Sequence, residues 1–183
     1  FVFAGISLSA QEHVHSSFFE EEGRYREHSL DMTSLDLVVD LNPSKRRVNG
    51  QASYQFMPIQ KEVDSAFFDA VDITIDHILL DDDTLQFEYV EGGVMVYFAP
   101  SLDWHRNYRL TFKYTCQPAK GIYFVGWDDP SSRARKQIWT QGQGINHRHW
   151  IPSFDDQNDK LVTSLHVSFP SEYTVIGNGV LQS

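Results

Sequence analysis

Two glutamines, Gln141 and Gln143, lie in a segment whose residue types suit the recognition of a polar ligand. Each side-chain amide carries hydrogen-bond donors and an acceptor, so it can pair with a charged or a neutral polar group. Gly142 and Gly144 alternate with the two amides, and glycine lets a backbone pass close to another group. We therefore expect the segment Gln137–Lys160 to be the place where a substrate or partner is bound.

Two histidines in the same segment, His147 and His149, could present their imidazoles on one face of a strand. A zinc site would need at least a third protein ligand, which the sequence does not single out. Hydrogen bonding within the fold is therefore the favoured role, with zinc binding as the alternative. The helical zinc signature, His-Glu-x-x-His, does not occur in the chain.

Asp155 and Asp156 form a carboxylate pair of the kind that glycoside hydrolysis uses. Adjacent residues of a strand point to opposite faces, so this pair is not expected to face one substrate. A simpler role for Asp155 is to pair with Arg148 or to cap a turn after Pro152.

The four tryptophans allow two interpretations. An exposed row of them could stack on sugars, which would make the chain a carbohydrate-binding module. The commoner role of tryptophan is to fill a core, and the sequence does not place the four on one face. They are Trp104, Trp127, Trp139 and Trp150.

Length and composition limit the classes of protein to consider. At 183 residues, with 41% hydrophobic and 14% aromatic residues, the chain is expected to form one globular domain. A net charge of -10 argues against a nucleic-acid partner, because phosphate binding needs clustered lysines and arginines. No apolar run is long enough for a membrane-spanning helix. Cys116 is the only cysteine, which excludes an intrachain disulfide and a cysteine-rich zinc site.

Three consecutive aspartates, Asp81, Asp82 and Asp83, lie in a stretch without lysine or arginine. Calcium takes clustered carboxylate oxygens, but the ligand spacing of an EF-hand and its glycine are missing. A solvated loop is the favoured interpretation, and a calcium site is the alternative.

The first residues differ from the rest. Residues 1–10, FVFAGISLSA, resemble the end of a secretory signal peptide, which predicts a periplasmic or secreted protein; an ordinary first strand is the alternative. Residues 11–33 are expected to form an arm that leads into the β-domain. The chain does not begin with methionine, and Gly179–Ser183 resembles the start of a hairpin's second arm, so we expect the chain to be a fragment of a longer protein.

Apolar and polar residues alternate through most of the chain after residue 30, which is the period of a strand with one buried face. The sequence EGGV at Glu91–Val94 predicts a tight hairpin. No helix with an apolar stripe is convincing. Residues 34–183 are therefore expected to form an all-β fold, a saddle-shaped antiparallel sandwich of many short strands. The expected strands are 34–41, 52–56, 71–75, 85–90, 94–98, 108–114, 122–125, 161–169 and 173–176.

The segment Gln137–Lys160 resembles the N-terminal domain of the aminopeptidase N family of zinc metallopeptidases, which includes leukotriene hydrolase. That family carries Thr/Ser-Gln-x-Glu/Gln, then an arginine, then a proline with aspartate three residues on, then a lysine. This chain matches the pattern in order and spacing, and weaker likenesses extend it over about 25–183. The matching residues are Thr140-Gln141-Gly142-Gln143, Arg148, Pro152, Asp155 and Lys160; the weaker ones are Lys120–Phe124, Val48-Asn49-Gly50 and Pro170–Gly179.

The resemblance implies a non-catalytic β-domain that caps a zinc-bearing catalytic domain and helps to form the substrate pocket. Gln143 matches the position that binds the free amino terminus of the peptide substrate, with Gln141 as a second substrate-binding candidate. Arg148 and Asp155 would be structural. No metal or cofactor is expected on this chain; zinc is expected in the catalytic domain, as an intramolecular partner.

Three features depart from the family pattern, and one of them is Asp156-Gln157 in place of the common Glu-Pro after Asp155. Gln143 stands where many members have glutamate, so the charge that would pair with an ammonium is lost. The zinc motif and the Gly-x-Met-Glu-Asn motif are missing, so this chain alone is not expected to hydrolyse peptides. A free-standing carbohydrate-binding or structural β-sandwich module remains the alternative.

Overall fold

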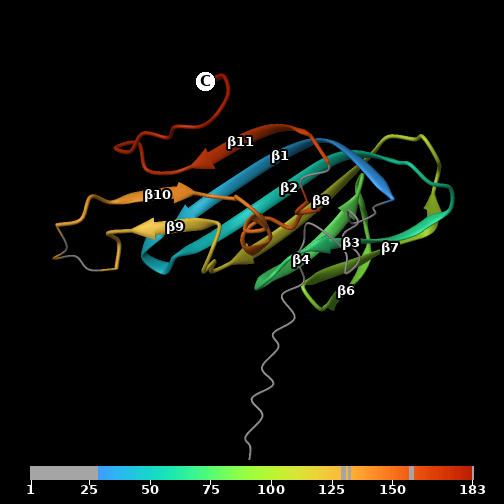
Figure 1. Cartoon of the computed structure of the whole chain (residues 1–183), viewed down its shortest axis with the longest axis horizontal. Helices are drawn as coiled ribbons and strands as arrows, with labels where there is room; N and C mark the ends of the chain where they lie inside the picture. Colours follow the sequence, from blue (N-terminus) through green and yellow to red (C-terminus); the bar gives the residue numbers. More distant parts are fainter. Residues whose placement is uncertain (1–28, 129–130, 132, 157–158, 183) are drawn as a thin grey trace, which may run out of the picture.

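The computed structural model describes residues 29–128, 131, 133–156 and 159–182 (Figure 1). The signal-peptide segment expected at 1–10 and most of the arm expected at 11–33 lie outside these residues. The first strand, β1 (Leu30–Asn42), already includes the last residues of the range expected to form the arm. The all-β prediction is confirmed, because the described elements are strands and two short 3-10 turns, Pro43–Lys45 and His147–His149.

A six-stranded sheet forms the larger layer, in the order β11-β1-β2-β8-β4-β5. Its neighbours pair antiparallel, except that β11 runs parallel to β1, with Leu35 opposite Thr163. The bounds beyond β1 are β2 (Arg47–Pro58), β4 (Ile73–Leu80), β5 (Asp83–Thr84), β8 (Tyr108–Cys116) and β11 (Val162–Ser168).

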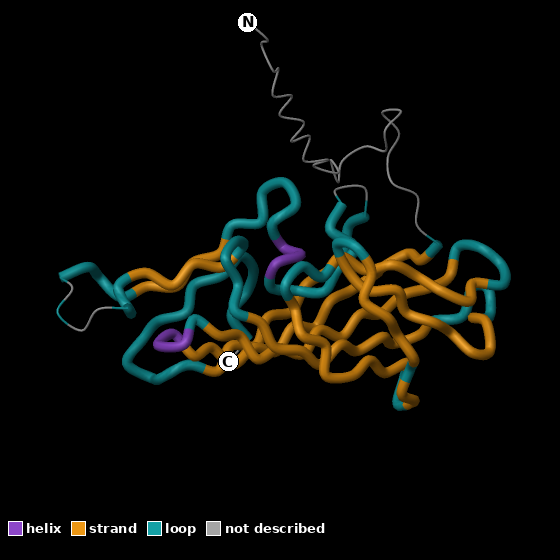
Figure 2. The backbone as a smooth tube through the Cα atoms, turned by 90° about the horizontal axis from the view of Figure 1, so that it is seen from below, coloured by secondary structure: helices purple, strands orange, loops and turns teal. Residues whose placement is uncertain are grey.

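A three-stranded sheet, β3-β7-β6, packs against the larger one; its strands are β3 (Val63–Asp69), β7 (Gly93–Leu102) and β6 (Gln86–Val90). The predicted hairpin at Glu91–Val94 is confirmed, with Val90 opposite Gly93. Gly92 has a φ of +80°, a conformation that glycine adopts without steric cost. A third, two-stranded ribbon of β9 (Ile122–Val125) and β10 (Gln137–Thr140) projects from one end (Figures 1 and 2).

The core lies between the two larger sheets. Alternate residues of β2 and β8 point inward, and Phe112 meets Phe68 of β3 with ring centroids 5.0 Å apart. Each large side chain buried in this way contributes about 1.5–3 kcal/mol of hydrophobic stabilisation. Gly50 lies opposite Tyr114, and a Cβ atom at position 50 would lie 2.2 Å from the tyrosine Cζ. The ring of Tyr114 therefore occupies the space that any other residue at position 50 would fill.

Local differences separate the fold from the prediction. Residues 173–176 do not form a strand. Three strands were not expected: β3, β10 and the two-residue β5. Neither β3 nor β10 shows a clear period of two in its apolar residues. No helix within the described part of the chain is long and apolar enough to span a bilayer.

Candidate functional site

The predicted substrate-binding residues lie on the loop that leaves β10. The backbone N–H of Gln141 donates to the carbonyl of Gly121 at 2.9 Å, which continues the pairing of the β9–β10 ribbon past the end of β10. The chain then turns away from the ribbon, and Gln143 lies on this turn. The side chains of Gln141 and Gln143 are both exposed, so both amides can reach a ligand.

Two glycines let this loop fold closely on itself and on the connection before β9. A Cβ atom at Gly142 would lie 1.8 Å from Nε2 of His147, so the imidazole ring packs directly on the glycine. A Cβ atom at Gly121 would lie 2.2 Å from the carbonyl oxygen of Asn146, and its φ is +83°. The close approach expected of glycines in this segment therefore occurs within the loop itself.

A buried ion-pair network lies at the base of the loop. The Nε of Arg148 lies 3.2 Å from Oδ2 of Asp155, so the pair suggested by the sequence is present. The same oxygen accepts the backbone N–H of Arg148 at 3.1 Å, and Nη2 of Arg148 donates to the carbonyl of Asp155 at 3.2 Å. The side chains of Arg148 and Asp155 are only 11% and 6% exposed. Arg148 therefore closes a tight turn of chain between the two residues.

A third member of the network, Asp69, was not identified from the sequence. It ends β3, its side chain is 2% exposed, and its Oδ1 lies 3.0 Å from Nη1 of Arg148. Its Oδ2 accepts the backbone N–H of Asp155 at 3.0 Å. The available signal was an aspartate inside the apolar run AFFDAV, because a charge among apolar residues is buried only with a partner.

The backbone around the network is joined to both sheets. Asp69 and Ser153 exchange backbone hydrogen bonds of 2.7 and 3.0 Å, and Val71 donates to the carbonyl of Arg148 at 2.8 Å. The hydroxyl of Tyr54, on β2, donates to the carbonyl of Pro152 at 2.7 Å. Gln143 thus lies on the exposed part of the loop, whereas the residues around Arg148 and Asp155 form its buried base.

The two histidines do not share one face of a strand, which corrects the expectation. They lie on the 3-10 turn His147–His149, where the chain has no alternation of faces. Burial lowers the pKa of His149, and the nearby Lys120 lowers it further. Within the described ranges no three residues of histidine, cysteine, aspartate or glutamate are grouped to hold a metal ion. His147 and His149 therefore lack a third described ligand with which to hold zinc.

The aspartates at 81–83 lie at the turn between β4 and β5. Oδ1 of Asp81 accepts the backbone N–H of Arg109 at 3.0 Å, and Oδ1 of Asp82 lies 3.4 Å from the Arg109 guanidinium. These exposed carboxylates are thus paired with an arginine of β8, in agreement with a solvated turn.

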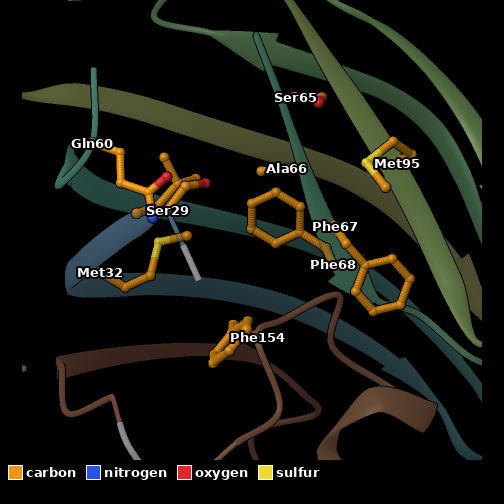
Figure 3. Close-up of a pocket in the computed structure, with 10 residues that line it drawn as sticks. Ser29, Met32, Gln60, Ser65, Ala66, Phe67, Phe68, Met95 and Phe154 are labelled. Atoms are coloured by element: carbon orange, nitrogen blue, oxygen red, sulfur yellow. The ribbon is translucent and has the colours of Figure 1, made fainter. Parts of the chain in front are cut away.

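A cavity bordered by the described residues lies away from the glutamines. It encloses about 430 Å³ between the start of β1, strand β3 and Phe154, and apolar side chains such as Met32, Phe67 and Met95 line it (Figure 3). Neither Gln141 nor Gln143 is among its lining residues.

The four tryptophans do not form one exposed row. Trp150 is 5% exposed and belongs to the core. Trp127 packs against Phe169, and Trp104 lies between β7 and β8. Trp139 is 43% exposed and stacks on Tyr123 of the neighbouring strand at 4.3 Å. Their scatter removes the main support for a sugar-stacking surface.

Sequence comparison gives a clear family match. The model of the peptidase M1 N-terminal domain matches residues 26–183 of this chain. No curated protein matches it.

Several solved structures resemble the fold. A two-domain M1 zinc metallopeptidase bound to L-arginine has 15% identity and a TM-score of 0.69, and the match covers 85% of this chain and 36% of that one. An M1 zinc metallopeptidase from Deinococcus radiodurans has 14% identity and a TM-score of 0.66, with 83% and 34% covered. Yeast LTA4 hydrolase has 15% identity and a TM-score of 0.60, with 78% and 23% covered. This chain thus spans about a third or less of the length of these proteins.

Proposed function

Because the chain belongs to the family of peptidase M1 N-terminal domains, we propose that it serves a zinc-dependent aminopeptidase as the non-catalytic β-domain that holds the amino terminus of the peptide substrate. The family match and the shared fold support the first part of this proposal. The exposure of Gln143 on a firmly held loop supports the second. Zinc and the peptide-cleaving groups belong, in this proposal, to a catalytic domain that this chain contacts.

The single observation that carries the substrate role is the position of Gln143. Its amide is exposed, while the base of the same loop is fixed by buried ion pairs and by both larger sheets. An amide oxygen accepts a hydrogen bond from an ammonium group without the cost of burying a second charge. Gln141, held at its backbone by Gly121, is the second amide on this surface.

The chemistry expected of this chain is orientation, not bond cleavage. A hydrogen bond from the substrate ammonium to Gln143 would fix the first residue of the peptide and so the position of the first peptide bond. Zinc, when bound in the catalytic domain, polarises the scissile carbonyl and activates water. The described residues of this chain do not group the ligands for such an ion.

The test of this role is Gln143→Ala in the full-length protein. We expect kcat/KM for peptides with a free amino terminus to fall roughly 10- to 150-fold, the equivalent of a lost hydrogen bond to a charged group worth about 1.5–3 kcal/mol. The matched control is Gln86→Ala, which removes an exposed glutamine amide from β6, in the other large sheet. Equal kcat/KM values in the Gln143 variant and the parent would remove Gln143 from the site.

A second variant tests the charge argument. Gln143→Glu places a carboxylate where the proposal puts the substrate ammonium, and charge-assisted hydrogen bonds are roughly twice as strong as neutral ones. We expect a lower KM for peptides with a free amino terminus. A KM that rises would show that no ammonium lies against this position.

A further inference from the structure

Asp69 holds both ends of the segment 148–155, which is the base of the loop 141–148, named the substrate loop after its proposed role. One carboxylate oxygen contacts the Arg148 guanidinium at 3.0 Å, and the other accepts the Asp155 N–H at 3.0 Å. Its backbone also pairs in both directions with Ser153. A single side chain at the end of β3 therefore fixes the start and the end of the segment 148–155.

The segment held by Asp69 is continuous with the loop that carries Gln143. This loop is attached to the ribbon at Gln141, through Gly121, and to the sheets at Arg148, through Val71 and Asp69. Between these two points the loop packs on its own residues, with Asn146 Nδ2 3.4 Å from the Gln143 carbonyl and the ring of His147 on Gly142, and it also packs on Gly121 at the Asn146 carbonyl. A shift of Arg148 would therefore displace the adjoining His147, whose ring packs on the glycine next to Gln143.

We propose that Asp69 is a positioning residue for the amine-binding site: acting through Arg148 and Asp155, it fixes the place at which Gln143 meets the substrate. This inference rests on the proposed function of Gln143.

The energetics of buried ion pairs favour a positioning role for this network. Such pairs add little net stability compared with apolar packing, because desolvation offsets much of their attraction. Their geometry, in contrast, is restrictive. Arg148 binds both carboxylates through the fixed planar fork of its guanidinium, which defines one orientation of the loop base.

The first test variant is Asp69→Asn in the full-length protein. The asparagine oxygen can still accept the Asp155 N–H, but the charge opposite Arg148 is lost, and an amide NH₂ turned toward the guanidinium would place donor against donor. We expect a 5- to 50-fold lower kcat/KM for peptides with a free amino terminus, with most of the change in KM. The matched control is Asp36→Asn, which changes an exposed carboxylate of β1 that contacts His166 of β11. It should keep the kcat/KM of the parent.

A double-mutant cycle separates positioning from general damage to the fold. If Asp69 acts through Gln143, then Asp69→Asn should change kcat/KM less than 2-fold in a protein that already carries Gln143→Ala. Coupling of this kind is expected only for residues that share one structural unit. If Asp69→Asn lowered kcat/KM by the same factor with and without Gln143→Ala, the proposal would be overturned. An unchanged kcat/KM in the single Asp69 variant would overturn it as well.

Arg148→Lys serves as a second variant if Asp69→Asn does not fold. Lysine keeps the positive charge but not the fork that holds two carboxylates, so the same loss and the same coupling to Gln143 are expected. The outcomes also separate the two proposals. A normal Gln143→Ala variant would overturn both, whereas an impaired Gln143→Ala variant with an independent Asp69 effect would overturn only the positioning role.

Discussion

Arg148 lies between two carboxylates in a place that water hardly reaches. Its side chain is 11% exposed, and those of Asp69 and Asp155 are 2% and 6% exposed. Removing one partner of such a buried network leaves a charge without compensation, which typically costs about 3–5 kcal/mol. At the scale of single residues, the base of the loop is therefore held by contacts that tolerate few substitutions, whereas the exposed Gln143 can be changed without disturbing the fold.

His149 gives the substrate loop a dependence on pH. Burial and the neighbouring Lys120 lower its pKa in the folded protein, so the unfolded chain binds this proton more readily. Stability contributed at this site is present above the ordinary histidine value of about 6.5 and falls as the pH drops below it. We expect His149→Gln to reduce the loss of stability between about pH 6.5 and pH 5, measured by urea unfolding across this range.

The control for this prediction is His166→Gln, because His166 is 62% exposed and its contact with Asp36 lies on the surface. Exposed pairs contribute little to stability. A His149 variant with the same pH dependence as the parent would show that this imidazole is not the group that titrates.

Strand β2 joins the larger sheet to the substrate loop through one hydroxyl group. Tyr54 is 2% exposed, and it donates to the Pro152 carbonyl at 2.7 Å. We expect Tyr54→Phe to lower the free energy of unfolding by about 1–3 kcal/mol, because the mutation leaves a buried carbonyl without its donor. Urea unfolding of the variant and the parent measures this difference.

Tyr97→Phe is the matched change at an exposed site. Tyr97, on β7, is 38% exposed and its hydroxyl donates to Glu88 on the neighbouring strand. We expect a change within about 0.5 kcal/mol, as for most surface substitutions. Equal losses in the two variants would argue against the Tyr54–Pro152 hydrogen bond as the link between sheet and loop.

At the scale of the whole molecule, the chain supplies a β-framework and the loop that carries Gln143, but its described residues do not group the ligands of a metal ion. A catalytic zinc site takes at least three protein ligands. Zinc titrated into the 183-residue chain is therefore expected to give no saturable heat and no rise in its thermal midpoint. Under the proposed function, a protein that joins this chain to a zinc-bearing catalytic domain should, in contrast, lose peptidase activity when a chelator is added and regain it with zinc. Saturable binding to this chain alone would contradict the assignment of zinc to a separate catalytic domain.

The sequence by itself determined the strands that bury one face. The alternation around Leu37 and Phe112 is local, and it survives in any fold that packs these strands against a core. It also determined the family, because the spacing from Thr140 to Lys160 is a property of the chain alone, and the family match over 26–183 confirms this resemblance.

Only the tertiary structure decided how the loop is held. Asp69 meets Arg148 because the end of β3 packs beside the loop, and no local period links residues so far apart in the chain. The same holds for the two histidines, which lie on a 3-10 turn where the ring of His147 packs on Gly142. Residue patterns report which face of an element is buried, whereas the partner across a core depends on how the layers are packed together.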